Sequence, residues 1–278
     1  MRTTIEKLQN RTPKENEDLL RDLFGQIFLV GTQEYQIQDI RNAVMVDLVK
    51  NRNIGSVIFR RQTFYQPADG TFDIRNEDDW LKFSNKLKDI AIGETGVPLL
   101  VAADHEGGSA SGFAKERIDI ATEFPPPLAL ASTFDPDNSC VAGRIAANDL
   151  ISMGINANLA PVLDVHFNVD ERVIGDRSFG EDPKIVSKFG AAFMEGLHNR
   201  NVVSVAKHYL GHGSTEEGIE SPGMVESDLA PSGLKTSLPP FQNAIEKGVD
   251  MIMTAYYRAP AIDQGNIAYN ERIISLLR

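Results

Sequence analysis

The chain has 278 residues, of which 42% are hydrophobic and 24% are charged, and its formal net charge is -11. This length and composition are typical of a globular protein with a sizeable core, built either as two domains or as one large barrel. The negative charge, together with the scattering of Lys and Arg along the sequence, argues against nucleic acid or a membrane surface as a partner.

Cysteine content and the first residues bear on the cellular compartment. Cys140 is the only cysteine, which excludes an intrachain disulfide and a thiolate metal cluster. The opening stretch, "MRTTIEKLQNRTPKENEDLL", is polar and has no apolar signal-peptide core, and no apolar run reaches the ~18 residues that span a bilayer. We therefore expect a cytoplasmic protein, or a secreted one if a leader has been removed.

Short apolar runs rich in β-branched residues recur along the chain, each bounded by glycine, proline or charge. They predict strands at 25–31, 54–60, 97–104, 155–164, 202–209 and 251–257. Amphipathic stretches predict helices between them, among others at 77–92, 138–154, 183–200 and 238–248. This alternation favours a parallel sheet covered by helices. The first strand is followed by "GTQEYQ" rather than by a glycine-rich phosphate fingerprint, which disfavours a dinucleotide-binding fold.

Polar residues share one position in the predicted strands. Asp104, Asp164, the pair Lys207 and His208, and the pair Tyr256 and Tyr257 close successive strands. Functional groups at the carboxyl ends of parallel strands are the pattern of a TIM-like (β/α) barrel, whose site is built from the βα loops. We predict an α/β fold of this class, formed as a single domain over 1–278. It is incomplete, because about six βα units are visible and a closed barrel has eight.

Three strand ends carry candidate binding groups. Asp104, followed by Glu106 and two glycines, either places a carboxylate in a cleft or, with Glu106, only caps a helix or pairs with an arginine. Asp164 either takes part in the site or hydrogen-bonds loop amides and shapes the loop. Arg177 offers a planar fork of donors to hydroxyl or carboxylate groups.

A metal site is disfavoured, although two histidines stand four residues apart. His208 and His212 have the spacing of a zinc-binding helix, and His105 and His166 could join them from neighbouring loops. However, glycines flank His212 and break any helix there, and the position after His208 is a tyrosine rather than the glutamate of an HExxH motif. We predict neither a metal nor a cofactor.

Several longer motifs carry a resemblance to a known family. In order, they are "ADHEGG", "FPPPLALASTFDP", "GINANLAPVLDV", "VIGDRSFGEDP", "AKHYLGHG", "LPPFQNAIEKGVDMIMTAYY" and "ISLLR". In order and spacing they resemble family 3 glycoside hydrolases, and most closely the β-N-acetylglucosaminidase branch. The resemblance implies a TIM-like barrel that removes a terminal sugar with retention, using an aspartate nucleophile and a general acid/base. It further implies that Asp104, Arg177, Lys207 and His208 bind the sugar.

The sequence departs from that branch at the expected acid/base and at one sugar-binding position. The branch carries an Asp-Ser-His segment after the GHG motif, whereas this chain has Gly218-Ile219-Glu220. Glu220 either serves as the acid/base, with its pKa raised in a closed site, or is a solvated loop residue. Gly112 stands where the branch usually has a second sugar-binding arginine, which leaves N-acetyl specificity open.

The family nucleophile is expected shortly after "LLR", and the sequence given stops at Arg278. Asp250 and Asp263 flank the sixth predicted strand, and neither takes the place of the nucleophile. Whether the chain is itself an enzyme is therefore left open. The main hypothesis is exo-removal of a terminal β-linked N-acetylglucosamine, or secondly glucose. The alternative is a catalytically silent carbohydrate-binding or structural protein. The expected partner is a small carbohydrate, and open barrel edges would favour self-association.

Overall fold

A computed structural model of the chain describes residues 12, 14, 26, 29–31, 44–59, 77–108, 121–168, 173–212, 229 and 233–277. The chain forms two compact units. One contains Met1–Ala103 and Ser152–Ile155, and the other contains Asp104–Ile151 and Asn156–Arg278. Each unit is described by itself, and the single-domain organisation over 1–278 stays a prediction.

The described part of the first unit contains three parallel strands and the helices that connect them. Strand β1 (Leu29–Gly31) pairs with β2 (Ser56–Phe59), and β2 pairs with β3 (Leu100–Ala103). Helices α3 (Val44–Arg52) and α4 (Glu77–Thr95) connect them in turn. All four residues of β2 are buried, as expected for a strand covered on both faces. Phe59 stacks against Trp80 and Phe83 of α4, with ring centroids 4.8 and 5.9 Å away, which anchors this helix on the strand.

The second unit repeats the strand–helix pattern and holds every candidate residue described below. Its parallel strands are β4 (Ala157–Asn158), β5 (Val203–Tyr209) and β6 (Met251–Thr254). Helix α5 (Pro127–Ala131) and α6 (Pro136–Ser152) precede β4, α7 (Pro183–His198) precedes β5, and α8 (Leu234–Glu246) precedes β6.

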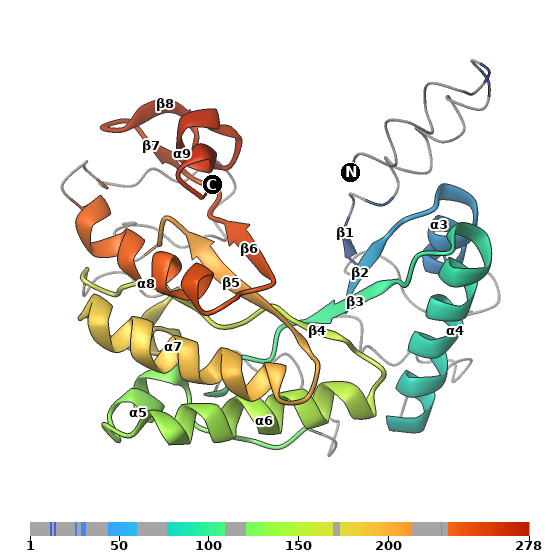
Figure 1. The fold of residues 1–278 in the computed structure, drawn as a ribbon, viewed down its shortest axis with the longest axis horizontal. Coiled ribbons are helices and arrows are strands. Elements are labelled where there is room, and N and C mark those ends of the chain that lie inside the picture. Colours follow the sequence, from blue (N-terminus) through green and yellow to red (C-terminus); the bar gives the residue numbers. More distant parts are fainter. Residues whose placement is uncertain are drawn as a thin grey trace, which may run out of the picture. The chain divides into compact units, whose positions relative to one another are not determined.

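Helix α7 lies between α6 and α8 (Figure 1). It begins at Pro183, a suitable first residue because the N–H that proline lacks would have no partner within the helix. The side chain of Asp182 caps the helix by accepting from the N–H of Lys184 at 2.8 Å. Gly143 of α6 and Gly196 of α7 let the two helices touch, because a Cβ at either position would lie 2.2 Å from a backbone oxygen of the other helix. The helices therefore cover the strands as one tightly packed layer.

Beyond β6 the chain leaves the strand–helix pattern. Strands β7 (Arg258–Ala259) and β8 (Asp263–Asn266) form an antiparallel hairpin, followed by the 3-10 turn η4 (Ile267–Tyr269) and the helix α9 (Glu271–Ser275). The sequence analysis did not predict this hairpin. None of the helices in the described part of the chain is long and apolar enough to cross a bilayer.

Most predicted elements are confirmed, with shifted ends. All six predicted strands contain an observed parallel strand, and the four predicted helices correspond to α4, α6, α7 and α8. The fourth strand is shorter than predicted, because only Ala157–Asn158 is regular and Pro161 has no N–H to donate. Backbone bonds from Val205 to Ala160 and from Lys207 to Pro161, both 3.0 Å, still join this segment to β5. The described residues thus supply six parallel strands of a barrel class that has eight when closed.

Candidate functional site

The segment after β3 presents two carboxylates and two glycines. The side chain of Asp104 is 33% exposed, whereas that of Glu106 is 2% exposed. Gly107 and Gly108 have φ angles of 98° and 56°, and a Cβ on either would lie 2.6 Å from an atom of Phe124 or Pro126. These glycines therefore allow the segment to pack closely against Phe124 and Pro126.

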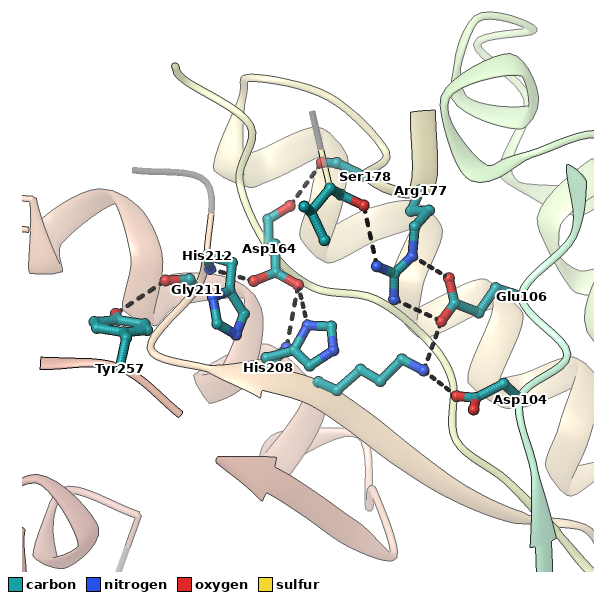
Figure 2. Close-up of polar contacts among 11 residues, drawn as sticks. Asp104, Glu106, Asp164, Arg177, Ser178, His208, Gly211, His212 and Tyr257 are labelled. Carbon is teal, nitrogen blue, oxygen red and sulfur yellow. Dashed lines mark hydrogen bonds and ion pairs between the residues drawn. The ribbon is translucent and has the colours of Figure 1, made fainter. Parts of the chain in front are cut away.

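Lys207 on β5 joins the two carboxylates. Its Nζ lies 2.5 Å from Asp104 Oδ1 and 2.5 Å from Glu106 Oε1. Arg177, in the 3-10 turn η3 (Gly175–Arg177), donates to the other side of Glu106 with a planar fork, Nε to Oε2 at 2.7 Å and Nη2 to Oε1 at 2.9 Å. Figure 2 shows Glu106 held between these cations. Together they form a four-residue charged network (Asp104, Glu106, Arg177 and Lys207).

Two members of this network, Glu106 and Lys207, keep their charges at neutral pH. Burial would raise the pKa of Glu106, but the neighbouring Lys207 and Arg177 outweigh it and lower this pKa to about 2. Burial would lower the pKa of Lys207, but Asp104 and Glu106 raise it above its ordinary value. Glu106 is thus a permanent anion that cannot donate a proton at neutral pH, and Lys207 stays a cation.

A second buried carboxylate, Asp164, organises the loop that follows β5. Its Oδ2 accepts from His208 Nδ1 at 2.9 Å and from the His208 backbone N–H at 3.1 Å, and its Oδ1 accepts from the His212 N–H at 2.5 Å. Burial would raise the pKa of Asp164, but the two histidines and these hydrogen bonds hold it well below its usual range. Because an ionised carboxylate can only accept, Nδ1 of His208 is the donor in this contact.

His212 continues this arrangement away from the charged network. Its ring centroid lies 5.0 Å from that of His208 and 5.2 Å from that of Tyr257. The hydroxyl of Tyr257 donates to the carbonyl of Gly211 at 2.9 Å, which ties the region after β6 to this loop (Figure 2). Burial lowers the pKa of His212 to about 4, although Asp164 opposes the shift, so its ring is neutral at pH 7.

The structure brings three of the predicted binding residues into one network. Lys207 pairs directly with Asp104, and Glu106 links Lys207 to Arg177. His208 follows Lys207 in the chain but binds Asp164. Glu106 pairs with an arginine, as one reading expected. Asp164 accepts from the backbone N–H groups of His208 and His212, the loop-amide contacts that one reading expected. The binding roles themselves stay predictions.

Two of the predicted positions, Gly112 and Glu220, lie outside the described residues, so the structure does not bear on either. Within the part of the chain that the structure describes, no group of three or more His, Cys, Asp or Glu side chains is arranged to hold a metal ion. The sequence did not indicate that Glu106 bridges two cations, Arg177 and Lys207.

Parallel strand–helix units with a charged network at the ends of the strands are the pattern of an α/β protein of the TIM-like barrel class. Residues 12–278 match the family described as "Glycosyl hydrolase family 3 N terminal domain". The chain belongs to this family.

Named relatives and solved structures agree with this membership. A β-hexosaminidase from Hydrogenovibrio crunogenus is 34% identical over 171 residues, covering 59% of this chain and 46% of that protein. The structure of a family 3 β-N-acetylglucosaminidase from Paenibacillus sp. str. FPU-7 gives a TM-score of 0.76 at 29% identity, over 88% of this chain and 43% of that one. A β-N-acetylhexosaminidase from Beutenbergia cavernae gives 0.74 at 27%, over 93% and 73%.

These likenesses confirm the predicted fold class, an incomplete TIM-like α/β barrel. The chain covers 46%, 34% and 51% of the length of three curated relatives, so it spans about half or less of each of these three.

Proposed function

We propose that this chain carries the sugar-binding site of a β-N-acetylhexosaminidase-type glycosidase that removes a terminal β-linked N-acetylglucosamine, with glucose as the second candidate. The observation that carries this proposal is the charged network at the ends of β3 and β5. Lys207 is held ionised by Asp104 and by the buried Glu106, while Asp104 itself is one-third exposed. The names of the relatives, β-hexosaminidase and β-N-acetylglucosaminidase, support the same substrate.

The network has the donors and acceptors that a sugar ring needs. Lys207 uses two of its three N–H donors on Asp104 and Glu106, so one donor remains for a hydroxyl. Asp104 uses Oδ1 for Lys207, and the described residues place no hydrogen bond on its Oδ2, which can accept from a hydroxyl. Such hydrogen bonds to charged groups contribute ~1.5–3 kcal/mol each and hold the ring in one orientation.

The described carboxylates bind and orient rather than break the glycosidic bond. A retaining glycosidase needs one carboxylate as nucleophile and one protonated group as acid. Glu106 is occupied on both oxygens by Arg177 and Lys207, and Asp164 is occupied by His208 and His212. Both are held as anions of low pKa, so neither can supply the proton. We propose Glu220 as the acid/base, and we assign the nucleophile to no described residue.

The same observation supports a second candidate, a carbohydrate-binding protein without hydrolytic activity. It is favoured by the complete engagement of Glu106 and Asp164, because a site that only binds needs ionised groups and no free acid. Hydrolysis of nitrophenyl N-acetylglucosaminide by the protein expressed from its whole coding sequence separates the two. Turnover would favour the glycosidase, and saturable sugar binding without turnover would favour the binding role for this chain.

The binding proposal is tested by calorimetry with N-acetylglucosamine and with glucose. Asp104→Asn keeps the side-chain shape and removes the charge, and we expect it to weaken binding by ~1–3 kcal/mol. Arg177→Ala is expected to weaken binding on the same scale, because it also removes one support of Glu106. Asp250→Asn, the same chemical change at the amino end of β6, is the matched control and should leave affinity unchanged. Equal affinities in all four proteins would overturn the proposal.

The acid/base proposal is tested separately in a form of the protein that turns over substrate. Glu220→Gln is expected to slow substrates with poor leaving groups far more than activated aryl glycosides, because an activated leaving group needs no protonation. Equal losses on the two substrate types, or no loss, would return Glu220 to the solvated-loop alternative.

A further inference from the structure

The segment that carries Asp104 and Glu106 is fixed by contacts on the side away from the charged network. The residue between them, His105, is fully buried. Its backbone N–H donates to Oδ1 of Asn158 at 3.0 Å, and its carbonyl accepts from Nδ2 of the same Asn158 at 2.9 Å. The Asn158 side chain, itself fully buried on β4, thus pairs with the backbone of His105 as a neighbouring strand would.

The His105 side chain provides a second anchor, on helix α6. Its Nε2 lies 3.1 Å from Oδ2 of Asp149, and Asp149 also accepts from the N–H and the hydroxyl of Thr122 at 2.8 and 3.1 Å. The ring packs on Phe124 with centroids 5.0 Å apart. Two independent sets of contacts therefore hold one residue, and both lie within the second unit.

This residue controls the positions of both carboxylates. Asp104 and Glu106 are the direct chain neighbours of His105, and Lys207 Nζ reaches an oxygen of each at 2.5 Å. Charged hydrogen bonds of this length depend steeply on distance, so a shift of the His105 peptide would change both contacts at once. The contacts of Asn158 and Asp149 described above are with His105 and Thr122, which gives both residues a direct path to His105.

We propose that Asn158 and Asp149 are positioning residues of the sugar site, which act through His105 to hold Asp104 and Glu106 at the spacing that Lys207 bridges. The inference rests on the proposed function for its ligand, but its geometry stands without a sugar. It assigns a role to two residues that are not part of the charged network.

The first arm of the test measures sugar binding. Asn158→Leu keeps the size of the side chain and removes the paired donor and acceptor, and we expect affinity for N-acetylglucosamine to fall about tenfold, or ~1.4 kcal/mol. Ser139→Ala is the matched control, because Ser139 is equally buried in the same unit and donates to the carbonyl of Phe189 at 2.9 Å, between α6 and α7. Both variants lose a buried hydrogen bond, and only Asn158→Leu should lose affinity.

The second arm needs no sugar and keeps this inference separate from the proposed function. The shift in the denaturation midpoint is measured for Asn158→Leu, for Lys207→Met and for the double variant. If Asn158 positions the partners of Lys207, the two shifts do not add, whereas Ser139→Ala and Lys207→Met do add. Additive shifts with Asn158→Leu would overturn the inference even if sugar binds. A wild-type protein that binds no sugar, with shifts that do not add, would overturn the proposed function and leave this inference standing.

Discussion

Two histidine–aspartate pairs lie at opposite ends of strand β5. In each pair the ring nitrogen lies 2.9 Å from the carboxylate oxygen, but the two pairs differ in how deeply they are buried. Near the carboxyl end, His208 Nδ1 meets Asp164, and the two side chains are 12% and 0% exposed. Near the amino end, His198 Nε2 meets Asp250, and these side chains are 32% and 42% exposed. Each pair joins one imidazole nitrogen to one carboxylate oxygen at the same distance, and burial is a large difference between the two pairs.

Burial changes what the carboxylate does. Asp250 accepts from the N–H and the hydroxyl of Ser204 as well as from His198, but water can replace part of these contacts. Asp164 accepts from two backbone N–H groups and one imidazole where water has no access. An exposed ion pair contributes little to stability, whereas breaking a buried one leaves uncompensated groups. The end of β5 that carries the candidate site is therefore also the one whose disruption costs most.

The largest expected effect is that of Asp164→Asn. The amide keeps the shape but turns one acceptor into a donor, which then faces an N–H of His208 or His212. We expect a loss of about 3–5 kcal/mol in the free energy of unfolding, the scale of breaking a buried charged pair. Urea unfolding at pH 7 measures it. A loss below ~1 kcal/mol would mean that burial does not separate the two pairs as argued.

The second largest expected effect is the pH dependence of the stability that the buried Glu106 contributes. Its folded pKa of about 2 lies below the ordinary 4.5, so its contribution to stability is complete above pH 4.5 and is lost as the pH falls through about 2. Glu106→Gln cannot titrate. We expect the difference in unfolding free energy between wild type and Glu106→Gln to shrink by on the order of 3 kcal/mol between these limits.

This difference is measured by urea unfolding at stepwise lower pH, down to the point where either protein no longer folds. Comparing the two proteins at each pH cancels the acid titration of the other groups, His212 and Asp164 among them, because both proteins share it. A difference that stays constant from pH 5 downward would show that the cations around Glu106 do not hold it ionised.

The sequence was enough to place the elements and most of the network. Apolar runs such as "SVIF" at β2 predicted the parallel strands, and the charged residues that end two of these runs identified Asp104 and Lys207. The hairpin after β6 was missed because its strands are short and carry no apolar alternation, as "DQGN" shows.

Pairing partners could not be read from the sequence. Glu106 and Arg177 are 71 residues apart, and several carboxylates were equally plausible partners for that arginine. Asn158 and Asp149 carried no signal at all, since a buried amide on a strand and an aspartate within a helix have no recognisable spacing to the site. Burial decided their roles, and burial depends on how the elements pack.

The smallest expected effect is that of Asp250→Asn, the same substitution made in the exposed pair. The amide keeps an oxygen that can accept from the N–H of Ser204, now 2.8 Å from the carboxylate, and solvent can compensate the lost contact with His198. We expect a loss of about 1 kcal/mol or less, and smaller still in high salt, which screens the exposed charges. Urea unfolding of wild type and Asp250→Asn in low and high salt measures both quantities. Because the contact distance of 2.9 Å is identical in the two pairs, equal losses for Asp250→Asn and Asp164→Asn would show that distance and not burial sets their strength.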